Sequence, residues 1–187
     1  ALDSPAIEAA LQAHLPIAEL QPILEGLGVA MPAPGRLVVY IDALELDALP
    51  DESVALNDAG RSVHAMIAPA ARHELQLAYV CSLALRVGLE VMSVVPIDRI
   101  DLLARCFLPA ANGRGEGELH PVVHLRLTHE QLKAMDLRRL EPVSTVTAVG
   151  GRVDWDAGRG FAPIAIGDLK LAAPAPPPPL QQLAAPA

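Results

Sequence analysis

Residues 72–95 form the longest apolar stretch of the chain, which contains no proline and one glycine, Gly88. Apolar side chains cover most of the circumference when the stretch is drawn as a helix, and such a helix is either buried or membrane-spanning. A narrow polar line interrupts the apolar surface at helical spacing and consists of Ser82, Arg86, Glu90 and Ser93. The pattern predicts a central core helix with one polar edge.

The segment before this helix predicts two short helices, one strand and one hairpin. Residues 4–27 carry an apolar stripe at helical spacing, which is interrupted at Pro16 and Pro22, and the proline-rich residues 31–35 are typical of a stiff linker. Residues 36–44 alternate as a strand does. Residues 53–68 resemble a hairpin with its turn at 57–60, and a short helix over 56–65 is the competing interpretation.

The segment after the helix predicts an antiparallel pair of strands and one further helix. Residues 97–108 and 120–127 form the pair around a polar glycine-rich loop, 111–119. Thr128 and Gln131 have the spacing of a capping box and predict a helix that continues to Leu140. Residues 141–166 are expected to be irregular or edge-strand material.

These elements predict an α+β fold: a mostly antiparallel sheet of about five strands packed on one long central helix, with a short N-terminal helical pair. We expect the helical pair to occupy residues 1–30 and the α+β domain residues 36–170. Residues 171–187 are dominated by alanine and proline, which predicts a disordered or extended tail.

Composition excludes some partners. The chain has 187 residues, of which 52% are hydrophobic, enough for one full core. Its net charge is −8, its arginines are scattered and its aromatic content is 3%, so we expect no binding to nucleic acid. Arg86 and Glu90 would each cost about 2.5–3.5 kcal/mol inside a bilayer, so we expect no membrane contact either.

The cellular compartment follows from the first residues and the cysteines. The N-terminal residues lack the pattern of a signal peptide, and Cys81 and Cys106 lie in apolar runs. Two buried thiols in a reducing cytoplasm are the preferred interpretation, and a disulfide between them is the alternative.

The most informative polar set is Ser82, Arg86 and Glu90. Arg86 and Glu90 are four residues apart and can form an ion pair on one helix face. We prefer the interpretation that the pair joins elements within the chain. The functional alternative is a polar mark at an interface with a partner.

A second, weaker set consists of Asp98, Asp101, His124 and Asp154. Carboxylates and imidazole are groups that a metal-dependent hydrolase or nuclease uses. However, an odd separation places Asp98 and Asp101 on opposite faces of a strand, and no lysine lies nearby. His120 and His124 share a strand face but would lie roughly 13 Å apart, too far for one zinc ion. We therefore expect no metal and no cofactor.

Several segments resemble an uncharacterised family of bacterial multi-module proteins of unknown function, in its C-terminal region. The similarity runs through about residues 35–166, and its most specific part is Tyr79-Val80-Cys81-Ser82. The other matching segments are Leu37–Asp42, Leu85-Arg86-Val87 with Glu90, Val95-Pro96-Ile97, Val122–Leu127, Leu132 and Gly160–Ile164. The resemblance implies one module of a longer bacterial cytoplasmic protein and assigns no substrate or catalytic residue.

Together these observations favour a non-catalytic interaction or assembly module of a bacterial cytoplasmic protein. The partner would be another protein or a second copy of the chain, and exposed apolar surface would lie on the central helix or the sheet face. The alternatives are a metal-dependent hydrolase or nuclease-type enzyme and a small-ligand sensor, which would need a pocket beside Arg86.

Overall fold

A computed structural model describes residues 4–33, 35–109 and 117–167. The predicted tail, 171–187, and most of the predicted loop, 111–119, lie outside these residues.

Within the described residues, five strands form one sheet in the order β1-β2-β5-β6-β7. Strand β2 pairs in parallel with β5, and the other neighbouring pairs are antiparallel. The strands are β1 (Gly26–Ala33), β2 (Arg36–Asp42), β5 (Arg99–Leu108), β6 (Glu118–Thr128) and β7 (Arg152–Val153). The predicted α+β class with a mostly antiparallel sheet is confirmed.

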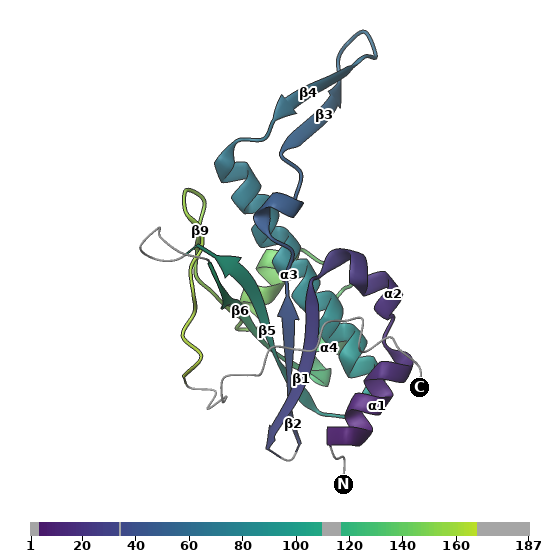
Figure 1. The fold of residues 1–187 in the computed structure, drawn as a ribbon. Coiled ribbons are helices and arrows are strands. Elements are labelled where there is room, and N and C mark those ends of the chain that lie inside the picture. Colours follow the sequence, from purple (N-terminus) through teal and green to yellow (C-terminus); the bar gives the residue numbers. More distant parts are fainter. Residues whose placement is uncertain (1–3, 34, 110–116, 168–187) are drawn as a thin grey trace.

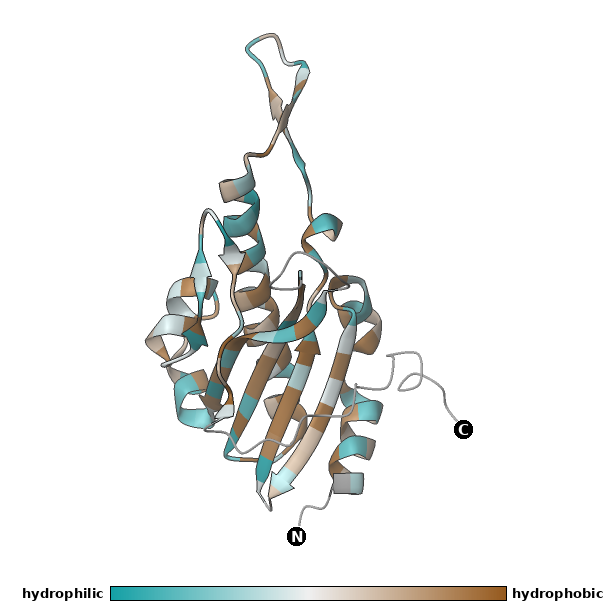
Figure 2. Cartoon of the chain, turned by 60° about the vertical axis from the view of Figure 1, so that its left-hand side comes forward, coloured by the Kyte–Doolittle hydropathy of each residue, from teal (hydrophilic) through white to brown (hydrophobic). Residues whose placement is uncertain are grey.

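Helix α3 (Pro69–Val94) covers one face of this sheet (Figure 1). Its apolar residues pack on the inward side chains of β2, β5 and β6 in one core. Hydrophobic residues are correspondingly concentrated along the sheet strands in Figure 2. The helix lies closest to the sheet at Gly88, where an added Cβ would be 2.5 Å from Leu127 Cδ1. The predicted central helix is confirmed, and it begins three residues earlier than the pattern indicated.

The predicted N-terminal helical pair is confirmed, but its second helix is shorter than expected and a strand replaces the predicted linker. Helix α1 (Ser4–His14) forms as expected, but the second helix is only α2 (Ile17–Leu20) followed by a 3₁₀ turn, η1 (Gln21–Ile23). The chain then enters strand β1, which pairs with β2 from Gly26 to Ala33. A boundary at residue 30 would therefore cut a strand, and the N-terminal segment is part of the sheet.

The C-terminal segment contains the predicted edge strand, β7, but its helices differ from the prediction. The Thr128–Gln131 capping box is present, but helix α4 (His129–Ala134) ends six residues before Leu140. Helix α5 (Pro142–Ala148) replaces the irregular segment expected there and packs on α3, with Val146 buried. A small hairpin, β8 (Trp155–Asp156) and β9 (Gly160–Phe161), is held on α3 because Trp155 Nε1 donates to the His73 carbonyl at 3.2 Å.

Strands β3 (Glu52–Leu56) and β4 (Ser62–Met66) form the predicted hairpin, and the competing helix over 56–65 is absent. The hairpin turns at Asn57–Gly60, where the Asn57 side chain accepts bonds from the backbone N–H groups of Ala59 and Arg61. A short 3₁₀ turn, η2 (Leu46–Ala48), leads into β3, and Ala68 leads from β4 directly into α3.

Both cysteines are buried free thiols, so the disulfide alternative is wrong. Burial raises the pKa of Cys81 to about 11 and that of Cys106 to about 12. Neither thiol has the low pKa or the access to solvent that a reactive cysteine needs.

Candidate functional site: the arm and the polar face of the sheet

The β3–β4 hairpin, here called the arm, projects beyond the rest of the fold (Figure 1). All ten of its strand residues are exposed. Directly paired residues of an antiparallel ladder share a face, so the arm has two faces. The Val54 face carries Glu52, Val54, Leu56, Ser62, His64 and Met66, and the Val63 face carries Ser53, Ala55, Val63 and Ala65.

The apolar residues of the arm are exposed to an unusual degree. Leu56 is 73% exposed, Met66 69% and Val54 61%. All three lie on the Val54 face, next to a contact between His64 Nδ1 and Glu52 Oε2 at 3.2 Å. An isolated two-stranded hairpin is marginally stable in water, and contiguous exposed apolar side chains mark interaction sites. The arm is therefore the candidate contact surface.

The sequence placed exposed apolar surface on the central helix or the sheet face, and the structure corrects that expectation. Most apolar residues of α3 are buried, and Val38, Tyr40 and Leu103 on the outer face of the sheet are also buried, with Ala30 and Ile166 packed against them. The exposed apolar side chains outside the arm are scattered among Ile23, Leu75, Phe107 and Leu137 in the described residues.

The polar line on α3 joins elements within the chain. Arg86 Nε donates to Glu90 Oε1 at 2.7 Å, and Arg86 Nη2 donates to Glu19 Oε2 at 2.8 Å. The guanidinium therefore connects α3 with α2, while Ser82 is exposed on the same helix. The small-ligand alternative requires a pocket beside Arg86. Arg86 lines neither of the two hollows described below.

A different polar cluster lies on the sheet face turned away from α3, around Asp101 of β5. Asp101 and Leu103 of β5 pair with Arg126 and His124 of β6, respectively. Asp101 Oδ1 accepts from Arg126 Nε at 2.9 Å and from His124 Nε2 at 3.1 Å. Its Oδ2 accepts from Arg36 Nε at 3.3 Å. One nearly buried carboxylate thus holds two arginines and a histidine.

The contacts of the cluster set its protonation. Burial alone would raise the pKa of Asp101, but the hydrogen bonds from His124 and Arg126 and the charge of Arg126 outweigh it and hold that pKa well below its usual range. Arg152 Nε, which is always a donor, lies 3.4 Å from His124 Nδ1. This contact assigns the His124 proton to Nε2, where it is donated to Asp101.

A hollow of about 450 Å³ opens beside this cluster. It lies between β6, the start of α4 and the turn after α5. Polar and cationic side chains form much of its wall, and none of the described residues that line it is acidic. The lining residues are His124, Arg126, Thr128, Gln131, Val149, Gly150 and Arg152.

Of the second predicted set, the structure brings only Asp101 and His124 together. Asp98 is exposed and contributes its backbone carbonyl to His129, and Asp154 forms an exposed ion pair with Arg159 at 3.0 Å. Among the described residues, no group of three or more His, Cys, Asp or Glu side chains is arranged to hold a metal ion. The convergence required by the hydrolase alternative is therefore not found there.

The histidines of β6 also differ from their predicted arrangement. A register shift at Ala104/Arg105 places His120 opposite Cys106, whereas His124 lies opposite Leu103. Cys106 belongs to the core under α3 and Leu103 to the outer face. The two histidines therefore lie on opposite faces, because the bulge inserts one residue between them.

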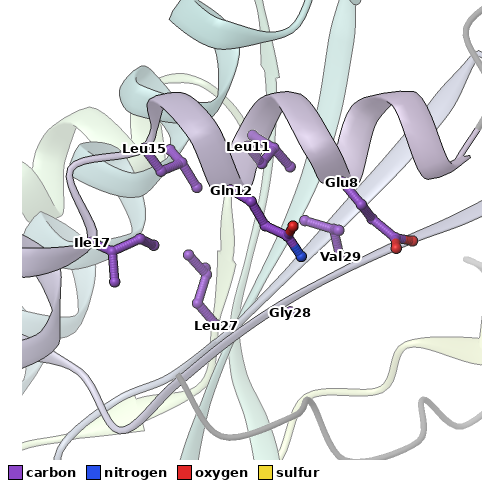
Figure 3. A pocket seen from close by; sticks show the side chains of 8 residues that line it. All are labelled: Glu8, Leu11, Gln12, Leu15, Ile17, Leu27, Gly28 and Val29. Carbon is purple, nitrogen blue, oxygen red and sulfur yellow. The ribbon is translucent and has the colours of Figure 1, made fainter. Parts of the chain in front are cut away.

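A smaller, apolar hollow of about 220 Å³ lies between α1 and the edge strand β1 (Figure 3). Leu11 from α1 and Leu15, the residue after its end, face Leu27 and Val29 from β1, and Glu8 lies toward one end. Apolar walls with so few polar groups offer packing contacts, and they supply no acid–base pair for catalysis.

Sequence reasoning missed the residues that matter most at both sites. The hairpin was predicted, but its exposure was not. An antiparallel pair with one face in water usually carries polar residues on that face, and the apolar residues on both faces of this hairpin depart from that pattern. Arg36 and Arg126 were also missed. Aligning residues 97–108 with 120–127 could have paired Asp101 with Arg126 only if the bulge had been known.

Comparison with known proteins gives no match among family models, curated proteins or solved structures. Helix α3 is the one helix in the described residues that is long and apolar enough to cross a membrane, and 56% of its most apolar window is buried inside the fold. Core helices of soluble proteins have the same length and composition.

Proposed function

We propose that this chain is a non-catalytic assembly module that associates through its β3–β4 arm, with a second copy of the chain as the partner. The observation that carries the proposal is the exposure of Val54, Leu56 and Met66 on one face of a hairpin that projects from the fold. Covering these side chains in a complex would remove apolar area from water, which stabilises association by about 25 cal/mol per Å² before the costs of binding.

A second copy fits the Val54 face because that face is self-complementary. It carries apolar side chains together with one carboxylate, Glu52, and one imidazole, His64. Two such faces related by a two-fold axis can bury the apolar residues against each other and exchange the Glu52 and His64 contacts. Two-fold dimers are the commonest oligomers of soluble proteins, and they require a single patch of this kind.

The test is the molar mass measured by light scattering over a range of concentrations. We expect the wild-type chain to approach twice its mass of 19.7 kDa, and the Leu56→Ser/Met66→Ser variant to remain at the monomer mass. Leu137→Ser, which removes a 56% exposed leucine outside the arm, is the matched control and should associate as the wild type does. A wild-type chain that stays monomeric at all concentrations, or a loss of association that is equal in both variants, would contradict the proposal.

A further inference from the structure

The Arg126 guanidinium forms a hydrogen bond within the protein, and about half of the Arg126 side chain is exposed to solvent. Its Nε donates to Asp101 at 2.9 Å, and the Asp101 side chain is only 4% exposed, whereas that of Arg126 is 49% exposed. Arg126 lines the hollow of about 450 Å³, and because its Nε is committed to Asp101 we place the fork formed by its two Nη atoms on the exposed side. A fixed guanidinium with its fork presented is pre-organised for a two-oxygen contact.

The charge around this hollow is opposite in sign to that of the chain as a whole. The net charge of the chain is −8, yet within the described part of the chain Asp101 is the single carboxylate that contacts Arg36 and Arg126, and Arg126 lines the hollow. The Thr128 hydroxyl and the Gln131 amide also lie in the wall, where the hydroxyl donates to Gln131 Oε1 at 3.2 Å and Gln131 Nε2 donates to the Val149 carbonyl at 3.4 Å. The local excess of positive charge favours an anion.

We infer that this hollow binds a small molecule through an oxyanion, a phosphate or a carboxylate, that accepts two hydrogen bonds from the Arg126 fork. Gln131 Nε2 already donates one hydrogen to the Val149 carbonyl, and its second hydrogen supplies a neutral donor from the start of α4. Asp101 acts as the positioning residue for Arg126. Both kinds of oxyanion match the planar fork in geometry and charge. This inference is independent of the arm, because the hollow and the arm are built from different elements.

The experiment is a titration of the wild-type chain with inorganic phosphate and, separately, with acetate, at an ionic strength kept constant with sodium chloride. Side-chain NMR signals of Arg126 Nε–H and the Gln131 amide report on the hollow directly. We expect saturable shifts with at least one of the two anions, and the anion that binds more tightly identifies the phosphate or the carboxylate class. Shifts that rise linearly without saturation for both anions would overturn the inference.

Variants separate binding from a general effect of charge. Arg126→Gln should weaken binding at least tenfold, whereas Arg138→Gln, which removes an exposed arginine elsewhere, should leave affinity within twofold. Arg126→Lys keeps a positive charge beside Asp101, which protects the fold, but it loses the fork, so we expect a loss of a few fold. Equal weakening by Arg126→Gln and Arg138→Gln, or wild-type affinity in Arg126→Lys, would contradict the role of the fork.

Discussion

Replacing Arg105 by methionine is expected to lower the free energy of unfolding by about 3–5 kcal/mol, the usual cost of leaving one charge of a buried pair without its partner. Arg105 Nε donates to Asp42 Oδ1 at 2.6 Å and Nη2 donates to Oδ2 at 2.9 Å. The two side chains are 10% and 11% exposed, and the guanidinium lies 5.4 Å from the centre of the Tyr40 ring. Without Arg105, the Asp42 carboxylate would remain buried and unpaired. Urea unfolding followed by circular dichroism at one fixed protein concentration measures the loss.

The double variant Asp42→Asn/Arg105→Met provides the control for this prediction. It removes both charges and nearly preserves the shape of the Asp42 side chain. That shape matters because the carboxylate packs closely against Gly26, where an added Cβ would be 2.6 Å from Asp42 Oδ2. The double variant should be more stable than Arg105→Met alone. A loss of less than about 1 kcal/mol in Arg105→Met would instead place this pair with weak surface ion pairs.

Gly88→Leu is expected to lower the free energy of unfolding by about 3 kcal/mol, at the upper end of the range for an overpacked core. Even the first added carbon would lie 2.5 Å from Leu127 Cδ1 and 3.2 Å from Leu102 Cδ1. Both leucines are fully buried, so they can move aside only by disturbing the packing of α3 on the sheet. Thermal and urea unfolding both report the change.

Ser82→Leu adds the same side chain to the same helix at an exposed position. It should change the free energy of unfolding by less than about 0.5 kcal/mol, as most surface substitutions do. If Gly88→Leu were as stable as Ser82→Leu, the helix could not approach the sheet as closely at Gly88 as the structure shows.

Elements with a strong hydrophobic period were predictable, and those set by tertiary contacts were not. Helix α3 and strands β2, β5 and β6 follow directly from their patterns. Strand β1 contains Gly26, Gly28 and Pro32, which have low strand propensity, and it exists because it pairs with β2 and is covered by α1. In α5 four of the five residues 143–147 are β-branched, which suggests a strand, but Pro142 in its first turn and the burial of Val146 against the core favour the helix.

The same contrast applies to the sites. The Arg86–Glu90 pair was readable because helical spacing is local, although its third partner, Glu19, was not. The cluster around Asp101 depends on the register of β5 and β6, which one bulge shifts, and so no spacing in the sequence shows it. The exposure of the arm depends on how the other described helices and strands pack away from it, which is a property of the whole fold.

Amide hydrogen exchange of the arm in a dilution series tests the central proposal most directly, because it both detects association and locates it. At high concentration the proposal predicts protected amides in Glu52–Leu56 and Ser62–Met66, and dilution should remove that protection while the amides of α3 and β5 keep theirs. Arm amides whose exchange rates stay the same at every concentration would contradict association through the arm.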